Sequence, residues 1–315
     1  MTEAAATKTR YPTRFERAIL TKADAWLKGI LATADGPSPS PLPESAAKAA
    51  RAASRGAAKG TAPDPRLILL CMTPRSGSTA LSAALASTGQ LGLGGERLNR
   101  KNKTLNDIAT TTHPRTKREL LERVIDASRT PNGVAQIKCD LPQVLPFLLD
   151  PDCHAILGQA NYVYLTRGDL LGQAISRHRS NSAGVAHARG GDDTDAQAPY
   201  NFAAISSHLD HLTRMMASYE KVFAMLGIRP MRLTYEQITA EPGRVVRDIA
   251  RMVQVVVRVG EISGLDAGGY RKVSGSNNDT LREQFLAEAP SHVLLPGHSE
   301  ARVPRRARGG SDRNQ

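Results

Sequence analysis

From residue 66 onward, short apolar runs alternate with longer amphipathic segments. Four of these runs have the length of a strand and read LILLCM (67–72), GVAQIK (133–138), YVYLT (162–166) and PMRLTY (230–235). The clearest amphipathic segment runs from Ile205 to Leu226, where apolar residues recur at every third or fourth position, the spacing of one helix face. Strands that alternate with helices favour a parallel sheet covered on both faces. The sequence therefore predicts an α/β fold.

The two ends of the chain have a different composition. Residues 1–33 have apolar positions at helical spacing and predict a helix, whereas residues 35–65 are rich in Pro, Ser, Ala and Gly and predict a disordered linker. Residues 291–315 form a basic tail that we also expect to be disordered. We therefore divide the chain into an N-terminal extension (1–65), one folded domain (66–290) and this tail.

Length and composition are those of a soluble protein. The 315 residues are 40% hydrophobic, which is enough for one large core. No strongly apolar run approaches the roughly 20 residues that span a bilayer. The three cysteines, Cys71, Cys139 and Cys153, lie well apart without CxxC spacing, so neither a disulfide framework nor a structural zinc site is indicated. We expect a cytoplasmic protein without a transmembrane segment.

The formal net charge of +12 changes this picture little. Most of the excess lies near the ends of the chain, in residues 1–62 and 301–315, and the presumed folded domain is nearly balanced. Aromatic residues make up only 4% of the chain and do not alternate with a basic stripe. Sequence-specific binding of nucleic acid is therefore not expected, whereas a homodimer is left open.

The turn after the first predicted strand has the composition of an oxyanion site. In TPRSGST (73–79), Arg75 supplies a fixed positive charge, Gly77 lets the backbone approach a ligand, and the helix predicted from Ser78 presents unpaired amides. Ligands of parallel sheets bind beyond the carboxyl ends of the strands, where this turn falls. The loop lacks the Lys of the nucleoside-triphosphate pattern GxxxxGK[ST], so a magnesium-bound triphosphate is not indicated. A plain corner capped by Ser remains the alternative.

Four segments resemble segments of sulfotransferases that use 3′-phosphoadenosine 5′-phosphosulfate (PAPS). Their sequences are similar to those of the bacterial trehalose 2-sulfotransferase-like family. These segments are PRSGST (74–79), YLTRGDLLGQAISRHRSNSAGVAH (164–187), YNFAAISSHLDHL (200–212) and GIRPMRLTYEQITAEP (227–242). The resemblance covers about residues 66–286. It implies a P-loop-like parallel sheet flanked by helices, and transfer of the sulfuryl group of PAPS to a hydroxyl of a carbohydrate or glycolipid without a metal.

The resemblance also implies roles for individual residues. The residues that match the 5′-phosphosulfate loop are Arg75, Ser76, Gly77, Ser78 and Thr79. The pair that matches the 3′-phosphate site is Arg167 and Ser176, and Glu96 falls at the position of the general base. In this reading Glu96 takes the proton of the acceptor hydroxyl, and Arg75 stabilises the charge on the departing oxygen.

The chain departs from the family pattern in three places. Gly168 stands where family members often have a second arginine before the aspartate, GGERLN (94–99) replaces a Pro-x-Glu that is followed by aromatic residues, and Ala186 stands where a tryptophan is expected. Because aromatic rings often stack on sugar faces, their loss indicates either an acceptor other than trehalose or a changed acceptor site. Two alternatives therefore stay open: a non-catalytic protein that binds PAPS or its product adenosine 3′,5′-bisphosphate (PAP), and a nucleotide-dependent relative of kinases.

Other conspicuous side chains have more ordinary interpretations. Asp169 is expected to order its own turn, and Glu236 is expected to be structural. His208 and His211 have a spacing that occurs in metal sites, but no third ligand is apparent, so a polar helix face is favoured. The segment from Tyr270 to Asp279 combines basic residues with Gly and Asn and is either a cover for the nucleotide or a solvated loop.

Overall fold

The computed structural model describes residue 21 and residues 66–182, 198–257 and 276–289. The helix predicted over 1–33, the linker, the basic tail and Ala186 lie almost wholly outside this part of the chain, as does most of the segment from Tyr270 to Asp279. Within it, no helix is long and apolar enough to cross a membrane.

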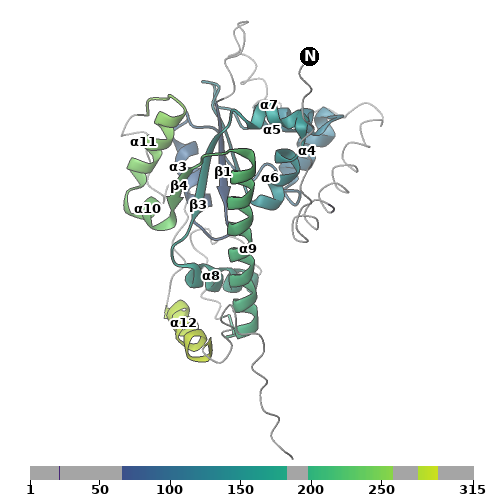
Figure 1. Cartoon of the computed structure of the whole chain (residues 1–315). Helices are drawn as coiled ribbons and strands as arrows, with labels where there is room; N and C mark the ends of the chain where they lie inside the picture. The colour runs from purple at the N-terminus through teal and green to yellow at the C-terminus, as the bar shows by residue number, and fades with distance from the viewer. Residues whose placement is uncertain (1–20, 22–65, 183–197, 258–275, 290–315) are drawn as a thin grey trace, which may run out of the picture.

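A four-stranded parallel sheet forms the centre of the fold and confirms the predicted α/β class (Figure 1). Its strands are β1 (Leu67–Met72), β2 (Ala135–Cys139), β3 (Asn161–Thr166) and β4 (Met231–Thr234), in the spatial order β2-β1-β3-β4. β1 is buried along its whole length, as expected for a central strand with helices on both faces. In this strand order the chain reverses its direction of winding between β1 and β3, the place where parallel sheets bind ligands.

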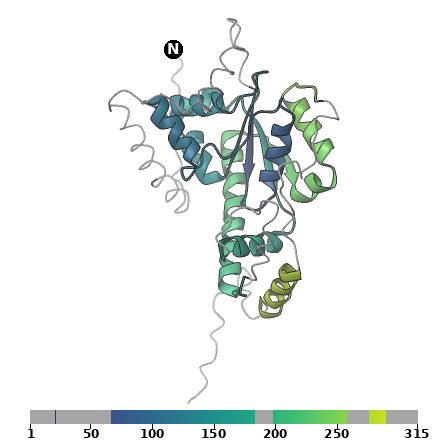
Figure 2. The same ribbon diagram turned by 180° about the vertical axis from the view of Figure 1, so that it is seen from behind.

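The two faces of the sheet carry separate hydrophobic cores. Ile68 and Leu70 of β1 point into one core, and Leu69 and Cys71 point into the other, as the alternation of side chains along a strand requires. The first core is covered by α3 (Ser78–Ser87), α10 (Tyr235–Ala240) and α11 (Pro242–Met252). The second is covered by α4 (Lys103–Thr112), α5 (Lys117–Asp126), α6 (Leu141–Leu148), the 3-10 turn η2 (Pro151–Cys153), α7 (His154–Leu157) and part of α9 (Phe202–Leu226). Figures 1 and 2 show these two groups of helices on opposite sides of the sheet.

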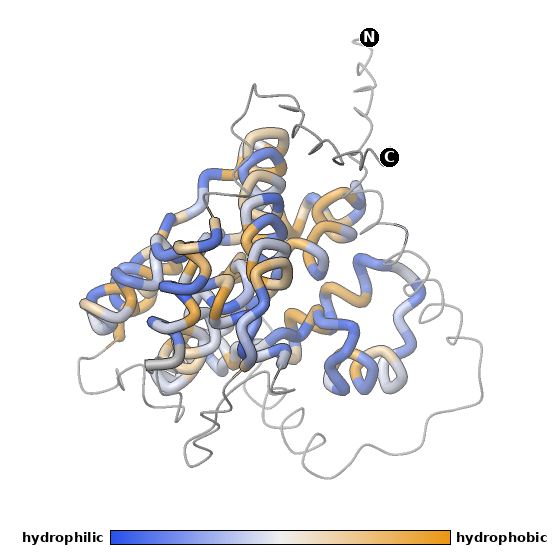
Figure 3. Tube along the Cα trace, turned by 90° about the horizontal axis from the view of Figure 1, so that it is seen from below, coloured by the Kyte–Doolittle hydropathy of each residue, from blue (hydrophilic) through white to orange (hydrophobic). Residues whose placement is uncertain are grey.

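A third layer lies beyond the carboxyl ends of the strands. It consists of α8 (Leu170–Ser182), α12 (Ser276–Glu288) and the N-terminal half of α9, and these helices share a small core that includes Ile175, Leu212 and Phe285. Phe285 also stacks on Phe202, with ring centroids 4.7 Å apart. Hydrophobic and hydrophilic positions alternate along the helices (Figure 3), as expected where each helix buries one face. This layer places α8 directly below the end of the sheet.

Candidate active site

The loop after β1 has the backbone shape of an anion-binding turn. Arg75 has φ +67°, in the left-handed region that non-glycine residues rarely adopt. Gly77, the residue before α3, has φ +82°, and no side chain caps the amides that open this helix. The hydroxyl of Ser76 is buried and has no hydrogen-bond partner among the described residues. The loop therefore presents the amides that open α3 and a buried hydroxyl beside the guanidinium of Arg75.

Gly77 is required by close packing as well as by its backbone angle. A Cβ atom at this position would lie 2.6 Å from Cδ2 of Tyr235, much closer than carbon atoms can approach. The same tyrosine ring lies under the guanidinium of Arg167, whose Cζ is 4.7 Å from the ring centroid. Tyr235 therefore supports both the loop after β1 and the arginine that follows β3.

The turn after β3 is ordered by carboxylates. Glu236 accepts hydrogen bonds from the amides of Gly168 (3.1 Å) and Asp169 (3.4 Å). Asp169 accepts from the amide of Gly172 at 2.9 Å and pairs with Arg282 of α12 at 2.6 Å. The structural roles predicted for Asp169 and Glu236 are thus confirmed. Nη2 of Arg167 lies 3.6 Å from Oδ2 of Asp169, whereas its Nε is buried and has no hydrogen-bond partner in the described chain.

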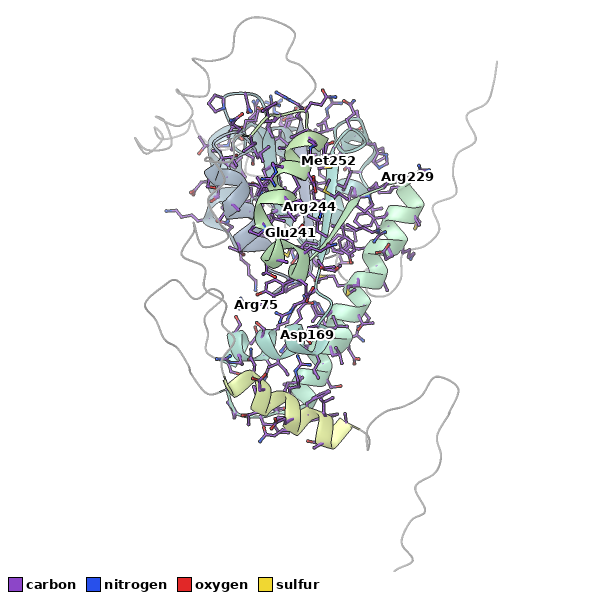
Figure 4. The ribbon with its side chains drawn as sticks, turned by 90° about the vertical axis from the view of Figure 1, so that its left-hand side faces the viewer. Arg75, Asp169, Arg229, Glu241, Arg244 and Met252 are labelled. Atoms are coloured by element: carbon purple, nitrogen blue, oxygen red, sulfur yellow. The ribbon has the colours of Figure 1, made fainter. Side chains whose placement is uncertain are left out.

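Side chains of α8 join these two strand ends. Nε of Arg75 donates to Oγ of Ser176 at 3.1 Å. Gln173, one turn earlier, donates to Oγ1 of Thr73 at 2.8 Å and to the carbonyl of Pro74 at 2.6 Å. Figure 4 shows Arg75 and Asp169 at the level between the sheet and the layer of α8 and α12. The residues assigned to the two ends of the nucleotide therefore lie in one place.

The charge at this place is strongly positive. Burial lowers the pKa of Arg75, and the neighbouring Arg167 and Arg179 lower it further. Arg179 is itself only 6% exposed. Cations held together in this way favour a ligand that carries several negative charges, because such a ligand offsets their mutual repulsion.

A glycine-rich loop brings Glu96 to the same end of the sheet. A Cβ atom on Gly92, which has φ +84°, would lie 2.3 Å from the amide nitrogen of Gln136 in β2. The carbonyl of Gly95 then accepts from the amide of Lys138 at 3.0 Å. Only glycine permits this close approach of the loop to β2. The loop thereby fixes Glu96 beside the carboxyl end of that strand.

The carboxylate of Glu96 is held by three donors. Nζ of Lys138 lies 3.0 Å from Oε1, while Asn99 donates to Oε2 at 2.7 Å and Gln143 at 3.4 Å. Burial by itself would raise the pKa of Glu96, but these donors stabilise the charged form, and the pKa lies below its usual value. Glu96 is therefore ionised at neutral pH, as a general base must be.

Two residues near Glu96 were missed by the sequence reasoning. Lys138 is a charged residue in the buried strand β2. A lysine within the apolar run GVAQIK is the signal in the sequence that could have identified it. Asp140, which follows β2 and caps α6, has a pKa raised to about 6 by burial and by the charge of Glu96. No pattern in the sequence distinguishes Asp140 from an ordinary helix cap.

The histidines of α9 show no metal site. Burial is the main cause that lowers the pKa of His211 to about 4, followed by Arg177, Arg214 and His208. In residues 66–182, 198–257 and 276–289, no group of three or more His, Cys, Asp or Glu side chains could hold a metal ion. A polar helix face remains the interpretation of His208 and His211.

The geometry brings the predicted site residues into one arrangement. Arg75 touches Ser176 directly, Arg167 shares Tyr235 with Gly77, and Glu96 reaches Thr79 through Lys138, which donates to Oγ1 of Thr79 at 2.8 Å. Ser76 and Ser78 are buried at the start of α3. The arrangement combines a cluster of cations and amide donors with an ionised carboxylate, groups that suit the chemistry of anionic ligands.

Comparison with known proteins agrees with this chemistry. A search of curated proteins finds no match to the chain. The family model for Stf0 sulphotransferase matches residues 68–261, a range that contains the loop after β1, Glu96, α8 and all of the sheet except the first residue of β1. Since the match covers more than half of the sequence and the site lies within it, the chain belongs to the Stf0 sulphotransferase family.

Proposed function

We propose that this sulfotransferase takes its sulfuryl group from PAPS and transfers it to a hydroxyl of a carbohydrate or glycolipid. The observation that carries the proposal is the hydrogen bond between Arg75 and Ser176 at 3.1 Å, with Arg167 close enough to lower the pKa of Arg75. This contact joins the end of β1 to the helix after β3. A nucleotide with anionic groups on both its 5′ and 3′ positions matches such a site better than one with a 5′ chain alone.

The residues fit the donor. The amides that open α3, the buried hydroxyl of Ser76 and the guanidinium of Arg75 would hold the 5′-phosphosulfate, with the help of Ser78 and Thr79. Arg167, whose Nε has no partner among the described residues, would hold the 3′-phosphate with Ser176. PAPS supplies an activated sulfuryl group. Each proposed contact uses a group of this chain that can donate a hydrogen bond.

The chemistry needs a base and a stabiliser of the departing charge. Glu96 takes the proton of the acceptor hydroxyl as the new oxygen–sulfur bond forms, which contributes about 10²–10⁴-fold to the rate. As the bond from sulfur to the phosphate oxygen breaks, Arg75 and the amides of α3 stabilise the charge on that oxygen. PAP leaves as the second product. This scheme needs neither a covalent intermediate on the enzyme nor a metal.

The donor assignment can be tested by calorimetry. We expect PAP to bind with a stoichiometry of one, and ATP with Mg²⁺ to bind much more weakly because it lacks a 3′-phosphate. If ATP with Mg²⁺ binds more tightly than PAP, the alternative that the protein is a nucleotide-dependent relative of kinases is favoured instead. The matched variants are Arg167→Ala, which should weaken PAP binding, and Arg244→Ala, which removes an exposed arginine of α11 with its own acidic partners and should not.

The transfer itself can be tested with ³⁵S-labelled PAPS and a panel of sugars and glycolipids. We expect a labelled product with at least one of them, and the same rate in EDTA. Complete loss of transfer in EDTA would contradict the metal-free scheme. Binding of PAP without transfer to any acceptor would favour the non-catalytic alternative. A cytoplasmic location and a homodimer stay predictions.

A further inference from the structure

Lys138 has an unusual position for a lysine. It lies in β2, where every residue is buried, and its side chain is 5% exposed. Removing an ammonium group from water is costly unless the charge is paired. A lysine at this position therefore needs partners that offset the cost.

The partners of Lys138 lie on two different parts of the site. Nζ donates to Oγ1 of Thr79 at 2.8 Å and forms an ion pair with Oε1 of Glu96 at 3.0 Å. Thr79 belongs to the first turn of α3, and Glu96 ends the glycine-rich loop. One ammonium group therefore connects the helix at the donor loop to the candidate base.

The main chain of Lys138 holds the same loop. Its amide donates to the carbonyl of Gly95 at 3.0 Å, one residue before Glu96. On the other side, the amide of Gly95 donates to Oγ of Ser82 in α3 at 3.2 Å. The path from β2 to Glu96 and to α3 is thus fixed by both the backbone and the side chain of Lys138.

We propose that Lys138 is a positioning residue for sulfuryl transfer, which holds the carboxylate of Glu96 charged and oriented toward the donor loop through Thr79. The proposal rests on the proposed function. It assigns to Lys138 no contact with the substrates: it acts through Glu96 and Thr79. Asn99 and Gln143 also donate to Glu96, but both bind Oε2, whereas Lys138 binds Oε1, so neither can replace it.

Replacement of Lys138 should change the base more than the nucleotide site. Without the ammonium, Glu96 keeps two neutral donors but loses its opposite charge, so its titration midpoint should rise. The acid limb of the pH–rate profile should move by the same amount in the same direction. PAP affinity should change by less than about three-fold, because Arg75, Arg167 and the amides of α3 remain in place.

The experiment compares Lys138→Met with Lys138→Arg and with Lys117→Met. Lys117 is the first residue of α5, and its Nζ pairs with Oδ2 of Asp150 at 3.4 Å. Its replacement therefore removes a paired lysine that lies outside the candidate site. Carbon-13 NMR of the Glu96 carboxyl gives its midpoint, and kinetics give kcat and KM separately. We expect Lys138→Met to raise the midpoint and lower kcat about 10- to 100-fold, Lys138→Arg to restore part of both, and Lys117→Met to change neither.

A merely structural lysine would give a different result. In that case Lys138→Met would lower the melting temperature, but the Glu96 midpoint and the acid limb would not move, and the proposal would be wrong. If Lys138→Met fails to fold, the Glu96 midpoint is measured in Lys138→Gln and compared with that in Lys138→Arg. A midpoint in Lys138→Gln that equals that of wild type would again make the proposal wrong. Failure of the wild-type protein to bind PAP would overturn the donor assignment, whereas the Glu96 midpoint would still report on Lys138.

Discussion

Arg75 offers a sharp test, because it should contribute strongly to ligand binding and very little to folding stability. Its φ of +67° costs a non-glycine residue about 1–2 kcal/mol relative to glycine. Burial and two neighbouring arginines also disfavour its charge, as its lowered pKa shows. The ligand-free protein therefore holds Arg75 at a cost in folding stability.

The magnitude for Arg75→Gly follows from terms that nearly cancel. Glycine relieves the backbone strain and the repulsion from Arg167, but it loses the hydrogen bond to Ser176, about 0.5–1.5 kcal/mol. It also adds about 0.5–1 kcal/mol of chain entropy to the unfolded state. We expect the free energy of unfolding to stay within about 1 kcal/mol of wild type. PAP binding should lose about 1.5–3 kcal/mol, which is about 10- to 150-fold in Kd.

The assays are urea unfolding and calorimetric titration with PAP, with Arg75→Ala as the matched control. Alanine loses the same charge as glycine but keeps a Cβ atom at a positive φ, so it should be less stable than glycine by about 1 kcal/mol and should bind PAP equally weakly. The reasoning is refuted if Arg75→Gly unfolds with a loss of more than about 2 kcal/mol. It is equally refuted if this variant binds PAP as tightly as wild type does.

Three further substitutions test other parts of the site. Glu96→Gln should keep PAP affinity but lower kcat by about 10²–10⁴-fold, measured where chemistry limits the rate. Gly77→Ala should weaken PAP binding and destabilise the fold by at least about 1 kcal/mol, measured by urea unfolding, since its methyl group would meet Tyr235. Asp140→Asn tests the raised pKa of Asp140, which is about 6 in the folded protein against the usual 3.8. Because the folded protein holds this proton more tightly than the unfolded chain, the free energy of unfolding of wild type should fall as pH rises through 6. Asparagine still caps α6, so the variant should gain at most about 3 kcal/mol at pH 8 and little at pH 4, measured by urea unfolding at both values.

The strands and the main helices could be predicted because their signals are local. All four predicted runs overlap the observed strands, and the apolar repeat from Ile205 to Leu226 lies within α9. The periodicity of buried side chains is fixed by backbone geometry and is therefore visible in the sequence. The left-handed backbone of Arg75 could not be predicted in this way. Arginine rarely adopts a positive φ, so an arginine in the sequence does not indicate one.

The candidate site could be predicted only in part, since its contacts join distant residues. The composition of the loop from Arg75 to Thr79 identifies it as an anion site. Its contacts cannot be predicted in the same way, because Arg75 and Ser176 are 101 positions apart in the sequence and Thr79 and Lys138 are 59 apart. Nothing in the strand GVAQIK states which loop its lysine will meet. That depends on the order of the strands, which places β2 beside β1 and thereby beside α3.

The helix α9 limits how this enzyme can respond to its substrates. Its N-terminal half packs with α8 and α12, and its C-terminal half packs on the sheet, where Tyr219 donates to the carbonyls of Met72 and Cys139. The helix contains neither proline nor glycine, the residues at which helices most often bend. A hinge between the sheet and the layer below it would have to break this helix. We therefore expect the layer that carries Ser176 to move together with the sheet, as one unit, when substrates bind.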